Sequence, residues 1–227
     1  MRMFEHLHFL YNEATNMSKT KDKAEILAVI RDALLNYEEL IGQTFLYVFD
    51  NRCIEVLFRR KEFIHLAGID TYTKMGAEQL YKNIKKGILK PNQICFSNRH
   101  PYDLCKKKIR YLSNISQLTF SNVLILENLE TNTFTYMFGL TDLNFTLCLS
   151  EDYNENGILR SNYYIARSLR AENATNKSEN SFEIDFILSK RNDEGKYKDI
   201  LYESKNCSIE DLSVDILKKI EPDMYKK

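Results

Sequence analysis

One histidine is a candidate for proton transfer because apolar residues surround it in the chain. His65 lies in the segment FIHLAGI, residues 63–69, and Gly68 follows it three positions later. A histidine that is partly shielded from water can act as a general acid or base near neutral pH. A glycine lets another part of the chain approach the backbone closely. A structural histidine bonded to a backbone carbonyl is the more common case for such spacing, so both interpretations stay open.

A second candidate group lies in the segment YYIARSLR, residues 163–170. If this segment is a strand, alternate side chains share one face, namely those of Tyr164, Ala166, Ser168 and Arg170. That face would present a phenol, a hydroxyl and a guanidinium, and a guanidinium binds phosphate through two hydrogen bonds. An ordinary strand that faces solvent would show the same pattern.

The charges are segregated along the chain, although 32 basic and 32 acidic residues cancel overall. Residues 52–110 contain 14 basic and 5 acidic side chains, and such a block attracts polyanions even in a neutral protein. A solvated helix surface, or one facing an acidic region or partner, would also explain it. The loop at residues 173–180, with Lys177, is either a substrate contact or a simple connector. The candidate cations for binding nucleic acid in the block are Arg59, Arg60, Lys106, Lys107, Lys108 and Arg110.

Several function classes lack their characteristic motifs. The sequence contains no GxxxxGK[ST], no GxGxxG, no HExxH and no GxSxG. Its five cysteines are widely spaced without a CxxC pair, which fits a reducing compartment better than a disulfide framework. The four histidines are scattered, so we expect no metal site and no cofactor. Without a signal segment or an apolar run of about 18 residues, we expect a cytoplasmic protein and no membrane contact.

The hydrophobic periodicity predicts an α+β fold in a single compact domain, residues 1–227. N-terminal helices and a β-hairpin form a helical and basic part at residues 1–117. An antiparallel meander of about five or six strands follows at residues 118–227, with a closing C-terminal helix. The expected helices cover residues 3–17, 22–41, 77–86, 102–115 and 209–220, with a helical turn or buried loop at 61–70. The expected strands cover residues 44–49, 53–58, 122–129, 133–140, 144–150, 162–171, 181–190 and 196–204.

These motifs together resemble the phage-associated branch of the barnase–EndoU–colicin–RelE-like nuclease superfamily. The resemblance rests on His65 in FIHLAG after a short hairpin, on the basic KKKIRYL helix, and on YYIARSL with Tyr164. It extends over about residues 44–190 as scattered motifs. It implies helices followed by an antiparallel β-meander, in agreement with the order of elements expected from periodicity.

The resemblance also implies a metal-independent endoribonuclease, as a toxin or a phage- or defence-associated effector. The ribose 2′-OH would attack the adjacent phosphate and leave 2′,3′-cyclic phosphate ends. His65 would be the base or the acid in this reaction. Arg167 and Arg170 would stabilise the phosphate. Tyr164 and Ser168 would bond a phosphate oxygen or assist proton transfer. The basic residues would hold the RNA backbone, and an acidic antitoxin or inhibitor could cover them.

Two other hypotheses remain open. One is a non-catalytic phage or mobile-element protein that binds nucleic acid or a host protein, and the other is an enzyme without a readable motif. The nuclease hypothesis predicts that four side chains converge in one cleft beside the basic helix, namely those of His65, Tyr164, Ser168 and Arg170. The binding-protein hypothesis predicts a buried His65 and a Tyr164 that points into the core. The sequence predicts no oligomeric state.

Overall fold

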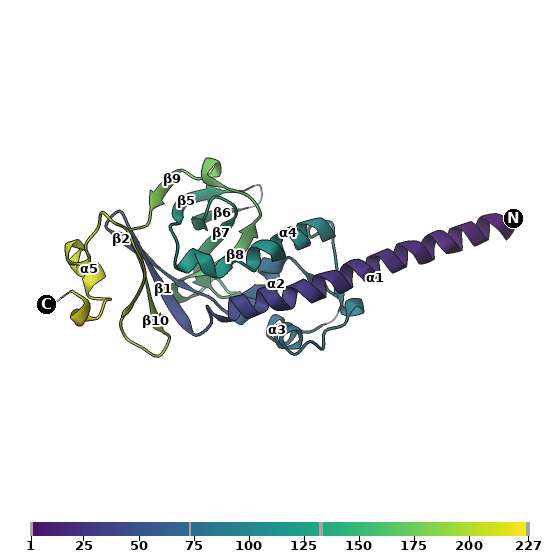
Figure 1. The fold of residues 1–227 in the computed structure, drawn as a ribbon, viewed down its shortest axis with the longest axis horizontal. Coiled ribbons are helices and arrows are strands. Elements are labelled where there is room, and N and C mark those ends of the chain that lie inside the picture. Colours follow the sequence, from purple (N-terminus) through teal and green to yellow (C-terminus); the bar gives the residue numbers. More distant parts are fainter. Residues whose placement is uncertain (1, 73, 132–133, 226–227) are drawn as a thin grey trace.

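The computed structural model describes residues 2–72, 74–131 and 134–225, with side chains from residue 20 onward. Within these residues it contains five α-helices and a nine-stranded sheet, which confirms the α+β class. Figure 1 shows the larger helices together beside the sheet, with the C-terminal segment at the opposite end of the molecule. None of the described helices is long and apolar enough to cross a membrane.

The first helix, α1 (Arg2–Glu38), runs without interruption for 37 residues. The predicted division into helices at 3–17 and 22–41 is wrong. No Gly or Pro occurs within residues 2–38, so the helix continues through residues 18–21, which separate the two expected helices. The C-terminal half of α1 packs against the body of the protein, whereas its N-terminal part extends away from it (Figure 1). The buried side chains recur every three or four residues at Ile26, Ile30, Ala33, Leu34 and Tyr37.

The sheet has the strand order β11-β10-β1-β2-β8-β7-β6-β5-β9. The hairpin strands are β1 (Gln43–Phe49) and β2 (Arg52–Leu57), as predicted. The remaining strands are β5 (Leu124–Glu130), β6 (Thr135–Thr141), β7 (Thr146–Tyr153), β8 (Leu159–Arg170), β9 (Asn180–Glu183), β10 (Phe186–Arg191) and β11 (Asp199–Glu203). The antiparallel meander contains four strands, β5 to β8, rather than five or six. The hairpin joins it through the parallel pair β2–β8, so elements from both sides of residue 117 share one sheet.

The segment 181–190, predicted as one strand, is two strands on opposite flanks of the sheet. β9 pairs with β5, whereas β10 pairs with β1, and only two residues separate them. The sheet must therefore curl until the β9 edge approaches the hairpin. Contacts across the curl agree: the rings of Phe49 and Phe182 lie 5.6 Å apart, and Arg52 Nη1 donates to Glu127 Oε1 at 2.7 Å. Periodicity could not reveal the break, because both strands are extended.

Three further helices pack with α1 on one face of the sheet. They are α2 (Arg60–Ala67), α3 (Ala77–Lys85) and α4 (Tyr102–Leu112), so the segment 61–70 is mainly helical. A short ladder of β3 (Asp70–Thr71) and β4 (Ile94–Cys95) connects them. Edge-to-face and tilted ring contacts at 5.2–5.5 Å join α1, α2 and α3. The rings belong to Tyr37, Phe63 and Tyr81.

The C-terminal segment covers a smaller core on the other face of the hairpin strands. The expected helix at 209–220 is reduced to a 3-10 turn and the four-residue α5 (Val214–Leu217). Ile216 and Ile220 still pack against Leu46 and Val48 of β1. The apolar residues of this segment are therefore buried although they do not form a long helix.

Candidate active site

The later part of β8 is an open strand edge covered by helices. β2 pairs with β8 only at Val56–Tyr164 and Leu57–Ile165. The chain then leaves the sheet to form α2, and no strand of the described residues continues this pairing. Both α2 and α4 contact β8 in its place. Side chains from two helices and one strand end can therefore meet here.

A pocket of about 560 Å³ lies at this meeting point. Five residues selected from the sequence line it, namely His65, Lys107, Lys108, Ser168 and Arg170. The other lining residues are Arg99, His100, Leu104, Tyr136, Leu169, Ala171 and Glu172. Residues up to 107 positions apart in the chain thus form one predominantly cationic pocket.

His65 occupies the last turn of α2, with an exposed side chain between the buried residues Ile64 and Leu66. Partial loss of hydration and then the charge of Lys108 lower the pKa of His65 below its usual value, while Glu62 acts in the opposite direction. The imidazole is therefore mainly neutral at pH 7 and can accept a proton.

Gly68 explains why the helix ends beside the pocket. It adopts a left-handed conformation, with φ of +70°, and caps α2 through hydrogen bonds from its N–H to the carbonyls of His65 and Ile64. Cys105 Sγ on α4 donates to the Gly68 carbonyl at 2.7 Å. A Cβ at this position would lie 3.2 Å from Lys108 Cδ. The close approach expected of this glycine is confirmed.

His100 is a second histidine of the pocket, and sequence reasoning missed it. Its Nδ1 lies 3.2 Å from Asp70 Oδ2, and Ser97 Oγ donates to the same oxygen at 2.6 Å. The carboxylate favours a proton on Nδ1 and leaves Nε2 to exchange a proton in the pocket. Asp70 reaches His100 because β3 pairs with β4, and these two-residue strands carry no periodic signal.

Lys108 and Arg170 bring two cations into the pocket without an acidic partner. Lys108 is only 8% exposed, and neither side chain makes an ion pair within the part of the chain described. Arg170 Nε is buried and has no hydrogen-bond partner among the described residues. Burial and then the charge of Arg170 lower the pKa of Lys108. An anionic ligand would relieve both the desolvation and the mutual repulsion.

A bulge in β8 separates the four residues expected on one face. Leu149 pairs with Ala166 and Cys148 pairs with Ser168, so Arg167 is the extra residue. Alternation changes phase at this point: Ala166 is buried in the main core, whereas Ser168 lines the pocket. The shared face predicted for Tyr164, Ala166, Ser168 and Arg170 is therefore wrong.

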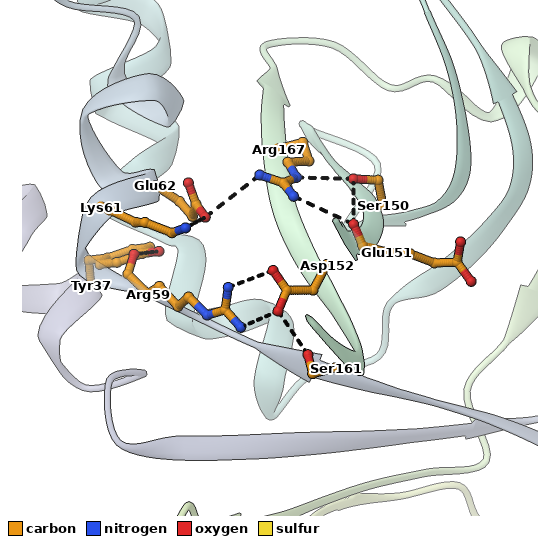
Figure 2. A network of polar contacts seen from close by, with 9 residues as sticks. All are labelled: Tyr37, Arg59, Lys61, Glu62, Ser150, Glu151, Asp152, Ser161 and Arg167. Atoms are coloured by element: carbon orange, nitrogen blue, oxygen red, sulfur yellow. Dashed lines mark hydrogen bonds and ion pairs between the residues drawn. The ribbon is translucent and has the colours of Figure 1, made fainter. Parts of the chain in front are cut away.

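Two expected catalytic residues lie outside the pocket lining. The ring of Tyr164 packs edge-on against Phe138 at 5.0 Å, and its hydroxyl is 3.0 Å from Met137 Sδ. Arg167 reaches Ser150 and Glu62 instead, as Figure 2 shows. Their catalytic roles stay predictions, and the geometry does not bring them to His65 as it does Ser168.

The cations expected to bind RNA are divided among several partners. Arg59 binds the buried Asp152 at 2.6 and 2.5 Å, and Arg60 pairs with Glu38 at 3.4 Å. Lys106 pairs with Glu25 at 2.6 Å and lines a separate groove between α1 and α4, as does Arg110. Lys177 pairs with Glu172 at 2.7 Å. Successive helical residues point about 100° apart, so the three consecutive lysines of α4 could not share one surface.

The pocket offers proton transfer and anion binding from side chains. His65 and His100 can each accept or donate a proton, while Lys108 and Arg170 can bind an anion such as a phosphate. Among the described residues, no group of three or more His, Cys, Asp or Glu side chains is arranged to hold a metal ion.

Comparison with known protein families matches residues 29–206 to the family described as phage-Barnase-EndoU-ColicinE5/D-RelE like nuclease4. The match covers well over half of the chain. The chain belongs to this nuclease family. The nuclease4 match confirms the resemblance seen in the sequence, and it includes every residue that lines the pocket. Comparisons with curated proteins and with solved structures gave no match.

Proposed function

We propose that this pocket is the active site of a metal-independent endoribonuclease. The observation that carries the proposal is that two histidines lie in one pocket with two cations that have no acidic partner among the described residues. Cleavage of RNA by its own 2′-OH needs a base, an acid and positive charge near the phosphorane. Side chains of the pocket can supply each of these groups.

In the proposed reaction His65 is the base and His100 is the acid. The lowered pKa of His65 keeps its imidazole able to accept the 2′-OH proton. As O2′ bonds to phosphorus, the bond to O5′ breaks, and His100 donates a proton to O5′. Asp70 is a positioning residue that orients the imidazole of His100 through its Nδ1. The products are a 2′,3′-cyclic phosphate and a 5′-hydroxyl end.

The cations and hydroxyls of the pocket would hold the phosphate during this reaction. Lys108 and Arg170 are proposed to bind its non-bridging oxygens, and Ser168 can donate a further hydrogen bond. Lys107 and Arg99 also line the pocket and can bind a neighbouring phosphate of the RNA backbone.

The exposure of His65 favours this proposal over a non-catalytic binding protein. That alternative requires a buried His65, whereas the side chain is exposed in the pocket. Its second requirement, a Tyr164 packed toward the core, is met through Phe138. We therefore give Tyr164 no part in the proposed chemistry.

The decisive experiment is RNA cleavage in the presence of EDTA, with the product ends identified. Wild-type protein should leave 2′,3′-cyclic phosphates, and a single 2′-deoxy substitution at the cleaved position should abolish cleavage there. His65→Ala should lower kcat by about 10²–10⁴-fold with an unchanged circular dichroism spectrum. His8→Ala, in the N-terminal part of α1, is the matched control and should retain activity. Cleavage that requires a metal ion, or that continues in His65→Ala, would refute the proposal.

We further propose that the enzyme acts as a toxin or a phage-defence effector in the cytoplasm. The phage-associated description of the family supports this role. An acidic antitoxin could cover the cationic pocket through charge complementarity. Expression of wild-type protein should then arrest growth, and expression of His65→Ala should not.

A further inference from the structure

Arg167 connects the bulge of β8 to the helix that carries His65. Its Nε donates to Ser150 Oγ at 3.1 Å, and its Nη2 donates to the Glu151 carbonyl at 3.5 Å. Its Nη1 lies 3.8 Å from Glu62 Oε1 in α2. Figure 2 shows the guanidinium between the strand residues and the helix residue. One planar side chain thus spans two neighbouring elements.

Glu62 is the helix residue through which this connection reaches the pocket. It lies in the first turn of α2, three positions before His65, so the two side chains share one helix face. Its side chain is only 13% exposed, and Oε1 is buried with no hydrogen bond to any residue that the structure describes. Two cations approach that oxygen at nearly equal distances, Arg167 at 3.8 Å and Lys61 at 3.7 Å. Of these two, Arg167 comes from the sheet.

A stronger ion pair fixes the beginning of the same helix. Arg59, at the N-cap of α2, binds Asp152 through two hydrogen bonds, and Ser161 Oγ donates to that carboxylate at 2.9 Å. Asp152 is 1% exposed, so this pair anchors α2 to β7 and β8 (Figure 2). The contact between Glu62 and Arg167 acts one turn further along the helix, closer to His65.

We propose that Arg167 is a positioning residue that holds α2 against β8 through Glu62 and keeps His65 opposite Ser168 and Arg170. The inference rests on the proposed function of the pocket and changes the role expected for Arg167 from phosphate binding to alignment. Ser168 directly follows Arg167 in β8. The residue that contacts α2 and the residue that lines the pocket with His65 are therefore neighbours in the chain. Without Arg167, α2 would remain attached at Arg59 but would move at its His65 end.

The test compares Arg167→Met with Lys61→Met. Each variant removes one cation near Glu62 Oε1, but only Arg167→Met breaks the link to the sheet. We expect Arg167→Met to lower kcat by up to about 100-fold with KM almost unchanged, since misplacement of a reacting group by about 1 Å has this effect. Amide hydrogen exchange in α2 should become faster in Arg167→Met. Both readouts should stay at the wild-type level in Lys61→Met.

A third variant and the exchange measurement make the outcomes distinct. Arg167→Lys keeps the charge but lacks the fork that reaches Ser150 and Glu62 together, so it should recover only part of kcat. A rise in KM with unchanged kcat in Arg167→Met would show substrate binding and overturn the inference. Unchanged exchange in α2 would also overturn it. If wild-type protein cleaves no RNA, the proposed function fails, and the exchange in α2 alone decides whether Arg167 positions the helix.

Discussion

Replacement of Gly68 by alanine should damage cleavage more than stability alone can explain. Gly68 has φ of +70°, a region in which a side chain costs about 1–2 kcal/mol. The new Cβ would also lie 3.2 Å from Lys108 Cδ, 3.5 Å from Lys108 Nζ and 3.6 Å from His100 Cδ2. The first of these contacts is too short, so Lys108 must move by a few tenths of an ångström. The strain and the displacement are separate effects, which a suitable control can separate.

Gly157→Ala is that control. Gly157 has φ of +72°, and nothing lies within 4 Å of its Cβ position. The two variants should therefore lose a similar 1–2 kcal/mol, or about 2–8 °C in Tm for a protein of this size. Only Gly68→Ala should displace a cation of the pocket.

The assay is kcat/KM on a short RNA, measured well below the Tm of both variants. If a displacement of about 1 Å costs about 100-fold, a shift of a few tenths of an ångström predicts a loss of about 3–10-fold in Gly68→Ala. Gly157→Ala should match the wild type. Equal activity of the two variants, with equal losses in Tm, would refute the assignment of Lys108 to the reacting phosphate.

Four further predictions follow from individual contacts. Asp70→Asn should reduce kcat because His100 loses its orienting carboxylate, but by less than His100→Ala does in the same cleavage assay. Because His65 must be uncharged to act as the base and its pKa is lowered, the acid limb of the kcat/KM profile should lie below the usual histidine value of about 6.5. An NMR titration should show that Lys108→Met raises that pKa, since Lys108 lowers it. Asp152→Asn should cost about 3–5 kcal/mol in denaturant unfolding, because it leaves a partly buried arginine unpaired.

The acid dependence of stability should depend on the ion pair between Arg59 and Asp152. Arg59, through its hydrogen bonds, lowers the pKa of Asp152 below its usual value. A carboxyl with a depressed folded-state pKa stabilises the protein above its unfolded pKa of about 3.9, and this contribution disappears as the pH falls through the folded value. Wild-type stability should thus fall on acidification below about pH 4, and Asp152→Asn should lack this component.

The sequence predicted those parts of the fold in which local pattern and final structure coincide. The hairpin, the helices at 77–86 and 102–115 and the α+β class depended on periodicity and turn residues, which act locally. The curl of the sheet could not be predicted in this way. It depends on the pairing of β9 with β5 and of β10 with β1, and both pairings join strands that are distant in the sequence. The predicted division of α1 was wrong because a local pattern misled. Asp22 and Glu25 have the spacing of a capping box, which favours the start of a helix, but no Gly or Pro before them ends the preceding turns.

The candidate site was predictable where the chemistry of a residue or of its neighbours in the sequence marked it. His65 and Gly68 were conspicuous by their neighbours, and both lie at the pocket. His100 and Asp70 were not, because 30 residues separate them and their contact depends on a two-residue ladder. The bulge at Arg167 changed the face of Ser168, and no pattern of alternation can reveal an extra residue before the partner strand is known.

Runs of positive charge were a weaker guide to the site than the partners of each charge. Lys106 and Lys108 lie two positions apart on α4, yet Lys106 is exposed and paired with Glu25, whereas Lys108 is buried and has no acidic partner in the part of the chain described. A surface pair contributes little, but a buried cation without a counter-ion carries a cost that the fold tolerates where a ligand can repay it. Arg170 is half-buried in the same pocket, and its Nε is buried with no hydrogen-bond partner among the described residues, although its strand is distant in the sequence. Two cations without an acidic partner among the described residues, beside two histidines, are difficult to explain by stability, and the phosphate of the proposed reaction would account for all four.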